Sequence, residues 1–249
     1  MTYSIGLAGK GGTGKTTIAG MLVKYLVEKG KTPVLAVDAD SNANFNEVLG
    51  LKITETIGNA REEMKKGVSV GMTKDVFMEM KIEESIIEAE GFDLIVMGRP
   101  EGSGCYCAAN SLLTRYLDRL IGNYNSVVID NEAGMEHISR LTTNNIDLLI
   151  IVSDASKRGI LSASRISELT EELHLNIGKR FFIINQVREE QFDFLNRIAE
   201  EHNLELAGII PEEKKIRDFD FEGRPTIELD EHNQALRSAY NIFNKIINN

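Results

Sequence analysis

The sequence predicts an α/β protein with a doubly wound, mostly parallel sheet of about seven strands and helices on both faces. Three observations lead to this fold class. Short apolar runs alternate with helical stretches along the 249 residues, and most of these runs are continuously apolar. A glycine-rich turn joins the first apolar run to the first helical stretch. Continuous apolarity is expected of strands that helices cover on both faces.

The predicted strands are short runs rich in β-forming apolar residues. They lie at residues 3–8, 32–40, 92–99, 126–132, 147–154, 180–187 and 204–211. Helices are predicted between them at residues 15–29, 110–122, 159–173 and 190–202. We find no internal repeat, low-complexity segment or linker, so residues 1–249 are predicted to form a single domain.

Residues 53–91 fit this alternation least. They contain a charged helix candidate at residues 55–67 and then a methionine-rich segment, VSVGMTKDVFMEMKIEESI. One interpretation is an irregular excursion packed against the sheet. The other is a partner-binding or mobile surface, since methionine side chains adapt to varied contacts.

The C-terminal stretch at residues 233–249 is predicted to be a helix with Leu236, Tyr240, Phe243 and Ile247 on one face. A membrane-surface helix usually has a cationic polar face, whereas this stretch carries only two basic residues. We therefore expect it to dock on the protein's own sheet.

Composition excludes several classes of protein. Lys plus Arg is 28 against 38 for Asp plus Glu, a net charge of −10 without a clustered basic run, which argues against a nucleic-acid partner. No apolar run reaches the roughly 18 residues of a membrane span, and the start lacks the pattern of a signal peptide. Two cysteines that lie almost side by side give no disulfide framework, so a cytoplasmic location is expected.

The segment GLAGKGGTGKTTIAG contains the spacing G-x-x-x-x-G-K-T, with its glycines at Gly9 and Gly14. In such a loop, backbone N–H groups and the following helix N-terminus hold phosphates. Lys15 is expected to reach the β- and γ-phosphates, and the Thr16 hydroxyl to ligate Mg²⁺. The expected nucleotide-contacting residues are Gly11, Gly12, Thr13, Gly14, Lys15, Thr16 and Thr17.

Lys10 is the unusual residue of this loop. The pattern KGGTGKTT resembles the deviant Walker A motif of the family that includes MinD, ParA and the nitrogenase iron protein. The resemblance implies a single P-loop ATPase domain, in which Lys10 crosses a dimer interface and touches the phosphates of the partner's nucleotide. Such a lysine supplies positive charge in trans, as an arginine finger does. The alternative is an exposed lysine that merely attracts an anionic ligand.

Acidic residues follow the ends of two predicted strands, where ligands of open α/β sheets bind. Asp38 and Asp40 lie where the second strand finishes, and Asp130 lies at the end of the fourth. The family resemblance implies that Asp38 orients or deprotonates the attacking water and that Asp130 holds a Mg²⁺-bound water. The resemblance allows either role for Asp40. We expect Asp40, together with Thr16, to bind magnesium. Helix capping is the alternative for some of these carboxylates.

Two further residues are placed by the same resemblance. Asn185, in IINQV, matches the position that recognises the adenine edge, and the loop of Pro211 matches one that closes over the base. A side-chain amide both donates and accepts hydrogen bonds, so Asn185 suits this role chemically. A turn asparagine is the alternative. The expectation of ATP over GTP rests on this resemblance.

Both cysteines, Cys105 and Cys107, occur in the segment GSGCYCAANS. A disulfide between them would require a strained ring, and two thiols are too few for a closed tetrahedral metal site. Four thiolates make a good site for Zn²⁺, Cu⁺ or an iron–sulfur cluster. If Lys10 implies a two-fold dimer, the partner supplies the second pair, and the dimer binds one metal. Two buried thiols without a ligand are the alternative.

GSGCYCAANSLL, the deviant P-loop and VVIDNEAGMEH together resemble the CooC family of accessory ATPases for nickel insertion into carbon monoxide dehydrogenase. A close relative of that family serves acetyl-CoA synthase. The resemblance implies a homodimeric, ATP-hydrolysing metallochaperone, with ATP/ADP and Mg²⁺ as cofactors. Ni²⁺, or Zn²⁺ in the same site, would bind to Cys105 and Cys107 across the dimer. The implied client is one of these two nickel enzymes, with no nucleic-acid or membrane partner.

Three other functions remain open. An electron-transfer ATPase like the iron protein holds its cluster with cysteines far apart in sequence, one of them after switch II, but DNEAGME has none. A partition ATPase of the MinD/ParA type would bind membrane or DNA, against which the acidic charge argues. A metal-sensing module is the third. The histidines share no metal-ligand spacing, so surface or structural roles are expected for His137, His174, His202 and His232.

Overall fold

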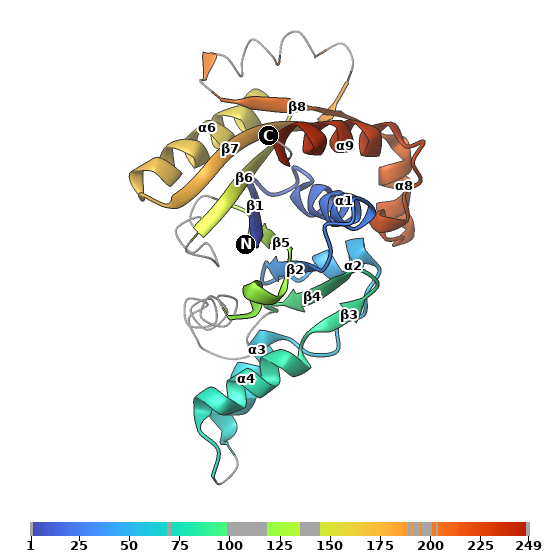
Figure 1. The fold of residues 1–249 in the computed structure, drawn as a ribbon. Helices are drawn as coiled ribbons and strands as arrows, with labels where there is room; N and C mark the ends of the chain where they lie inside the picture. The colour runs from blue at the N-terminus through green and yellow to red at the C-terminus, as the bar shows by residue number, and fades with distance from the viewer. Residues whose placement is uncertain are drawn as a thin grey trace.

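The computed structural model describes residues 2–68, 71–98, 119–134, 145–188, 191, 195, 201–202 and 204–247. Within these ranges the chain forms an eight-stranded sheet in the order β3-β4-β2-β5-β1-β6-β7-β8 (Figure 1). Neighbouring strands are parallel except β3 and β4. The strands are β1 (Tyr3–Gly9), β2 (Val34–Ala39), β3 (Ile87–Ala89), β4 (Phe92–Val96), β5 (Ser126–Asn131), β6 (Asn145–Asp154), β7 (Asn176–Val187) and β8 (Leu206–Pro211).

The predicted fold class is confirmed, with one additional strand. The seven predicted strands correspond to β1, β2 and β4 to β8, and the eighth strand is β3 at the edge of the sheet. The predicted helices at 15–29 and 159–173 are confirmed, whereas those at 110–122 and 190–202 lie mostly outside the described residues. The described α-helices are α1 (Lys15–Glu28), α2 (Phe45–Leu49), α3 (Ile57–Lys66), α4 (Lys74–Glu84), α6 (Lys157–Glu172), α8 (Lys214–Glu222) and α9 (Gln234–Ile247), and 3₁₀ turns lie at η1 (Ile121–Asn123) and η4 (Thr226–Glu228).

Helices cover both faces of the sheet, which explains why the strands are continuously apolar. On one face α1, α2, α8 and α9 form the largest core cluster with alternate strand residues. On the other face α6 packs over the β6 and β7 half, and α3 and α4 pack over the β2 and β4 half. In β2, Val34 and Ala36 join the first cluster while Leu35 and Val37 join the cluster under α3 and α4. Successive side chains point to opposite faces, so every position of β2 is buried.

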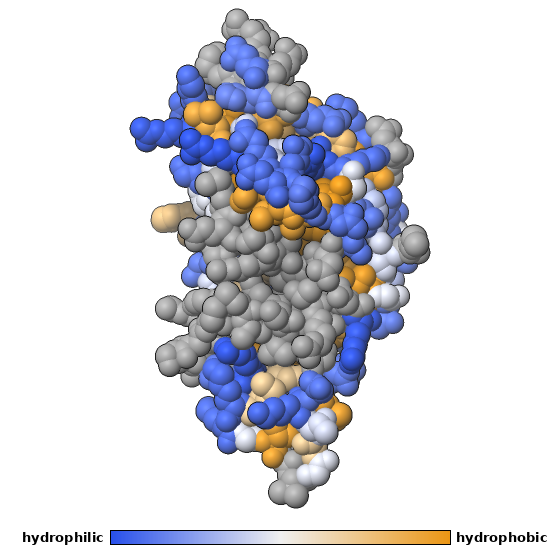
Figure 2. All heavy atoms as spheres, turned by 90° about the vertical axis from the view of Figure 1, so that its left-hand side faces the viewer, coloured by the Kyte–Doolittle hydropathy of each residue, from blue (hydrophilic) through white to orange (hydrophobic). Residues whose placement is uncertain are grey.

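Residues 53–91 form α3, α4 and β3 (Figure 1). The predicted packing against the sheet is confirmed, because Ile57, Met78 and Ile82 are buried against it. The segment is helical, however, and not irregular. Figure 2 shows exposed apolar side chains among hydrophilic ones at the lower end of the molecule, where α3 and α4 lie. Val76 and Met80 of α4 are both exposed.

The C-terminal helix α9 docks on the protein's own sheet, as predicted. Leu236 and Phe243 are buried in the main core, and Tyr240 and Ile247 pack against it. Phe243 and Tyr240 make edge-to-face contacts with Tyr25 of α1. The Asn233 side chain begins the helix by accepting a hydrogen bond from the Leu236 N–H at 2.9 Å. Among the described helices, none combines the length and apolar character that crossing a bilayer requires.

Candidate functional site

The loop between β1 and α1 is shaped by glycines whose backbone few other residues adopt. Gly12 and Gly14 have φ values of 80° and 82°. Gly9 lies so close to β6 that an added Cβ would be 2.3 Å from the Val152 carbonyl oxygen. The Thr13 hydroxyl donates a hydrogen bond to the Lys10 carbonyl at 2.9 Å, which closes the turn. The loop therefore has the preformed, glycine-dependent shape that phosphate binding requires.

Lys15 and Thr16 open α1 at the carboxyl edge of the sheet. The Lys15 side chain is buried, with 7% of the residue exposed. The Thr16 hydroxyl donates a hydrogen bond to Asp130 Oδ2 at 2.6 Å. Asp130 is the second-to-last residue of the strand β5, so this bond joins the start of α1 to the neighbouring strand. The structure thus brings together the lysine, the hydroxyl and the carboxylate that the sequence assigns to one site.

The Asp38 carboxylate holds the segment after β2. Its Oδ1 accepts from the Asp40 N–H at 3.0 Å, and its Oδ2 accepts from the Phe45 N–H at 2.9 Å. Phe45 is the first residue of α2, so Asp38 also caps this helix, as the alternative interpretation proposed. Burial raises the pKa of Asp38 to about 7, the Phe45 hydrogen bond lowers it, and the nearby Asp130 carboxylate raises it.

Asp130 is buried and only partly satisfied. Its Oδ1 has no hydrogen-bond partner. Burial raises the pKa of Asp130 to about 6, while Lys15 and the Thr16 hydroxyl lower it and Asp40 raises it. A hydroxyl oxygen beside an unpaired carboxylate oxygen is a donor set that a hydrated, hard divalent cation such as Mg²⁺ prefers. The residues present therefore fit this cation.

Asp40 and Lys10 lie nearer the surface. Asp40 acts electrostatically on both Asp38 and Asp130, and its Oδ1 accepts from the Asn42 N–H at 2.8 Å. Lys10 is exposed at the tip of the phosphate loop, and the ion pairs found between described residues do not include it. Its ammonium group is accordingly accessible to a molecule that approaches this edge.

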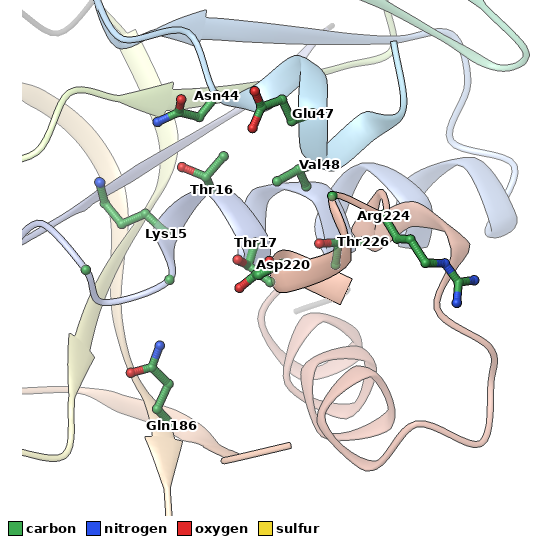
Figure 3. Close-up of a pocket in the computed structure, with 13 residues that line it drawn as sticks. Lys15, Thr16, Thr17, Asn44, Glu47, Val48, Gln186, Asp220, Arg224 and Thr226 are labelled. Atoms are coloured by element: carbon green, nitrogen blue, oxygen red, sulfur yellow. The ribbon is translucent and has the colours of Figure 1, made fainter. Parts of the chain in front are cut away.

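A cleft of about 410 Å³ opens beside the loop (Figure 3). The start of α1, α2 and the end of α8 with η4 form its walls, and Gln186 of β7 lies below the loop. The sequence motifs predicted the loop residues but none of the others. The complete lining is Gly12, Gly14, Lys15, Thr16, Thr17, Asn44, Glu47, Val48, Gln186, Asp220, Gly223, Arg224 and Thr226.

Asn185 and Pro211, which the sequence analysis assigns to the base, are not among the residues that line this cleft. The Asn185 amide is buried and donates a hydrogen bond to the Thr13 carbonyl at 2.9 Å, so it supports the phosphate loop. Its neighbour Gln186, which the sequence analysis did not single out, lines the cleft instead. Pro211 ends β8 and is not among the residues that line the cleft. The base-binding roles of Asn185 and Pro211 stay predictions.

The predicted sulfur site lies outside the described residues. Cys105 and Cys107 fall between residues 98 and 119, and His137 falls between residues 134 and 145. Within the described part of the chain, no group of three or more His, Cys, Asp or Glu side chains is arranged to hold a metal ion. Described positions His174, His202 and His232 therefore take no part in such a group.

Comparison with known proteins places the chain in a family. Residues 5–227 match the model of the CobQ/CobB/MinD/ParA nucleotide binding domain. The chain is 43% identical to an uncharacterized ATP-binding protein of Methanocaldococcus jannaschii, covering 98% of both chains. It is 31% identical to the carbon monoxide dehydrogenase accessory protein CooC of Rhodospirillum rubrum, covering 82% of this chain and 86% of CooC.

Solved structures support the fold. A chain of the MinC:MinD cell division protein complex of Aquifex aeolicus superposes with a TM-score of 0.76 at 24% identity, covering 100% of this chain and 96% of that chain. The septum site-determining protein MinD of Pyrococcus horikoshii, solved with Mg-ADP, gives 0.73 at 22% identity, covering 99% and 96%. At such identities the likeness shows the fold alone. With the match along residues 5–227, the chain belongs to the CobQ/CobB/MinD/ParA nucleotide binding domain family.

Proposed function

We propose that this protein is an ATP-hydrolysing metallochaperone that works as a homodimer and assists insertion of nickel into carbon monoxide dehydrogenase or acetyl-CoA synthase. The observation that carries the ATPase part is the bond between Thr16 and Asp130, next to buried Lys15 and an unpaired carboxylate oxygen. The similarity to CooC and the cysteine pair support the nickel part. The ATP-binding description of the M. jannaschii relative favours ATP as the nucleotide.

The described residues suggest how hydrolysis proceeds. Thr16 and Asp130 would hold Mg²⁺, directly and through bound water, and the cation when bound offsets phosphate charge. Lys15 would neutralise charge on the β- and γ-phosphates. Water attacks the γ-phosphorus, the bond to the β–γ bridging oxygen breaks, and the proton that the water loses passes to Asp38. A carboxyl pKa of about 7 suits a general base at neutral pH.

Asp38 can take this role without releasing the segment that it holds. Each carboxylate oxygen accepts one backbone N–H and has a second lone pair available for a water molecule. The same side chain would then couple the attacking water to residues 40–45. Removal of the γ-phosphate would thereby be sensed by α2, which forms one wall of the cleft.

Lys10 is the residue that would link nucleotide binding to dimer formation. Its exposed ammonium group would reach the phosphates of the partner's nucleotide and favour the closed dimer. In a two-fold dimer the segments of Cys105 and Cys107 would meet and share one Ni²⁺, with Zn²⁺ as a competitor of similar thiolate affinity. By linkage, metal and nucleotide must then favour each other's binding. Client docking would supply the metal selectivity that thiolate affinity does not.

The nickel part is tested by the metal content of the purified protein. Nickel per subunit is measured with and without ATP for the wild type and for the double variant Cys105→Ser/Cys107→Ser. We expect about one ion per dimer, tighter binding with ATP, and loss in the double variant. Equal nickel in the double variant refutes the sulfur site. A brown, iron-containing wild type instead indicates an electron-transfer ATPase.

The dimer part is tested by Lys10→Ala, with Lys66→Ala of α3 as the charge-matched control. Hydrolysis by Lys10→Ala should fall by a factor on the order of 10³, the lower range for a cationic finger, and ATP-driven dimerisation should weaken. Lys66→Ala should retain both. Unchanged turnover and dimerisation in Lys10→Ala exclude the trans role. Binding of DNA or lipid vesicles by the wild type points to a partition ATPase.

A further inference from the structure

Gln186 has a backbone conformation that is uncommon for its residue type. Its φ is 59°, in the left-handed region, within the strand β7. The pairing register between β7 and β8 shifts between Ile184 and Val187, so an extra residue is accommodated at this point. Bulges of this kind occur next to binding sites, where they re-aim a side chain. Residues in strained left-handed conformations likewise cluster at active sites and ligand-binding sites.

The bulge brings two consecutive amides to the same place. In a regular strand Asn185 and Gln186 would point to opposite faces of the sheet. Here both approach Gly14, where an added Cβ would lie 2.3 Å from Asn185 Nδ2 and 3.7 Å from Gln186 Nε2. The left-handed residue therefore turns Gln186 toward the nucleotide cleft, which it lines (Figure 3).

The two amides differ in what they have left to offer a ligand. Asn185 is buried and donates one of its two amide N–H groups to the Thr13 carbonyl, so part of its amide holds the loop. The Gln186 side chain is exposed to the cleft, and among the described residues its amide makes no hydrogen bond. An amide with a free donor and a free acceptor is thus positioned directly below the loop that takes the phosphates.

We infer that Gln186, the neighbour of Asn185, reads the edge of the nucleotide base and sets the preference for adenine. This inference rests on ATP as the nucleotide of the proposed function. With phosphates on the loop, the remainder of the same cleft, between Gln186 and α8, accommodates the base. An amide bonds adenine in a bidentate manner through N6 and N7. The corresponding edge of guanine presents two acceptors, O6 and N7, which one amide does not satisfy in this manner.

The test compares three ligands that differ in the base. Affinities of the wild type for ATP, GTP and inorganic tripolyphosphate are measured by competition with a fluorescent nucleotide. The variant is Gln186→Gly, because glycine adopts the left-handed backbone readily and the fold is retained. We expect the wild type to prefer ATP. In the variant ATP affinity should fall about tenfold, the effect of losing one bidentate contact, with GTP and tripolyphosphate affinities unchanged.

The matched control is His174→Gly. His174 also has a left-handed φ, of 50°, but it follows α6 and does not line the cleft. It should gain stability from the same backbone relief and keep the preference for ATP. An equal loss for ATP and GTP in Gln186→Gly, or no loss for ATP, overturns the inference. If the wild type binds tripolyphosphate but no nucleotide, the ATP function fails instead, so the two failures are distinguishable.

Discussion

Asp38 and Asp130 are register partners on the adjacent parallel strands β2 and β5, and both carboxyl groups are buried. Their side chains therefore lie on the same face of the sheet, next to each other. Burial raises the pKa of both carboxyl groups, and the Asp130 carboxylate raises that of Asp38 further. Before a cation binds, the site thus holds two acids whose ionisation opposes folding. The same arrangement should favour the binding of a cation, whose positive charge stabilises both carboxylates.

This pairing makes a prediction for the pH dependence of stability without Mg²⁺ or nucleotide. The pKa of Asp38 is raised to about 7 in the folded protein, so folding favours its protonated form. Its contribution to stability is complete below the ordinary carboxyl pKa of 3.8 and is lost as pH rises through about 7. The variant Asp38→Asn has no titrating group at this position, so its stability should not show this decrease as pH rises. We expect the variant to be less stable than the wild type near pH 5, because one of two N–H groups loses its acceptor.

The difference in the free energy of unfolding between the wild type and Asp38→Asn should then narrow or reverse by pH 8. Urea unfolding of both proteins in EDTA, at intervals between pH 5 and pH 8, measures it. A stability difference that stays constant over this range would show that Asp38 does not titrate as stated.

Asp130 and Thr16 predict how the protein depends on magnesium. Asp130→Asn should raise the Mg²⁺ concentration for half-maximal ATP hydrolysis by about 10- to 100-fold, as expected when an outer-shell partner is lost. Thr16→Val should be affected at least as strongly, because it also loses the hydroxyl ligand. Thr16→Ser keeps the hydroxyl and should behave like the wild type. Magnesium titrations of steady-state hydrolysis provide the measurement.

The matched control for this prediction is ADP binding in EDTA. There Asp130→Asn should bind at least as tightly as the wild type, since a carboxylate repels phosphates. Unaltered magnesium dependence in Asp130→Asn would remove the carboxylate from the cation site.

The two left-handed glycines of the phosphate loop give a paired prediction. Alanine at Gly12 meets no atom within 4 Å and suffers only the left-handed strain, about 1–2 kcal/mol. Alanine at Gly14 suffers the same strain and in addition displaces the Asn185 amide, which lies 2.3 Å from the new Cβ. The bond to the Thr13 carbonyl is then lost, costing about another 1 kcal/mol. Urea midpoints and nucleotide affinity should both fall further in Gly14→Ala. Equal effects in the two variants would contradict this role of Asn185.

Much of this arrangement follows from local sequence pattern. The strands are predictable because both faces of β2 and its neighbours are buried, which requires continuous apolar runs. Lys15, Thr16 and Asp130 meet because parallel strands end at one edge of the sheet. For the same reason Asp38 and Asp130, far apart in sequence, become neighbours.

The remaining features depend on pairing between distant segments. β3 has only three residues and owes its extended form to β4, so its own sequence carries little signal. The directions in which the Asn185 and Gln186 side chains point depend on a shift in the pairing register between β7 and β8. The local motif IINQV does not encode this shift. Asp220 and Arg224 line the cleft because of how α8 packs. The charged sequence around them looks like that of an ordinary solvent-exposed helix, so it does not indicate a binding site.

The wall that α2 contributes to the cleft depends on close packing against α1. Gly20 lies in the middle of α1, where alanine is ordinarily favoured by about 1 kcal/mol. A Cβ at Gly20 would, however, lie 2.2 Å from Val48 Cγ1 of α2. Val48 is a branched side chain with few alternative rotamers, so α2 itself would have to move. We therefore expect Gly20→Ala to destabilise the protein by about 1–3 kcal/mol, as overpacked positions do.

The double variant Gly20→Ala/Val48→Ala separates this contact from any other effect of the alanine. It should recover most of the lost stability, whereas Val48→Ala alone should cost little, because Val48 is only half-buried. Since Val48 also lines the cleft, nucleotide affinity should fall in Gly20→Ala and return in the double variant. Urea unfolding and nucleotide competition on all four proteins complete the cycle. If the two substitutions are simply additive, α2 is not held in place by this contact, and the cleft wall must be set by Asp38 and Phe45 instead.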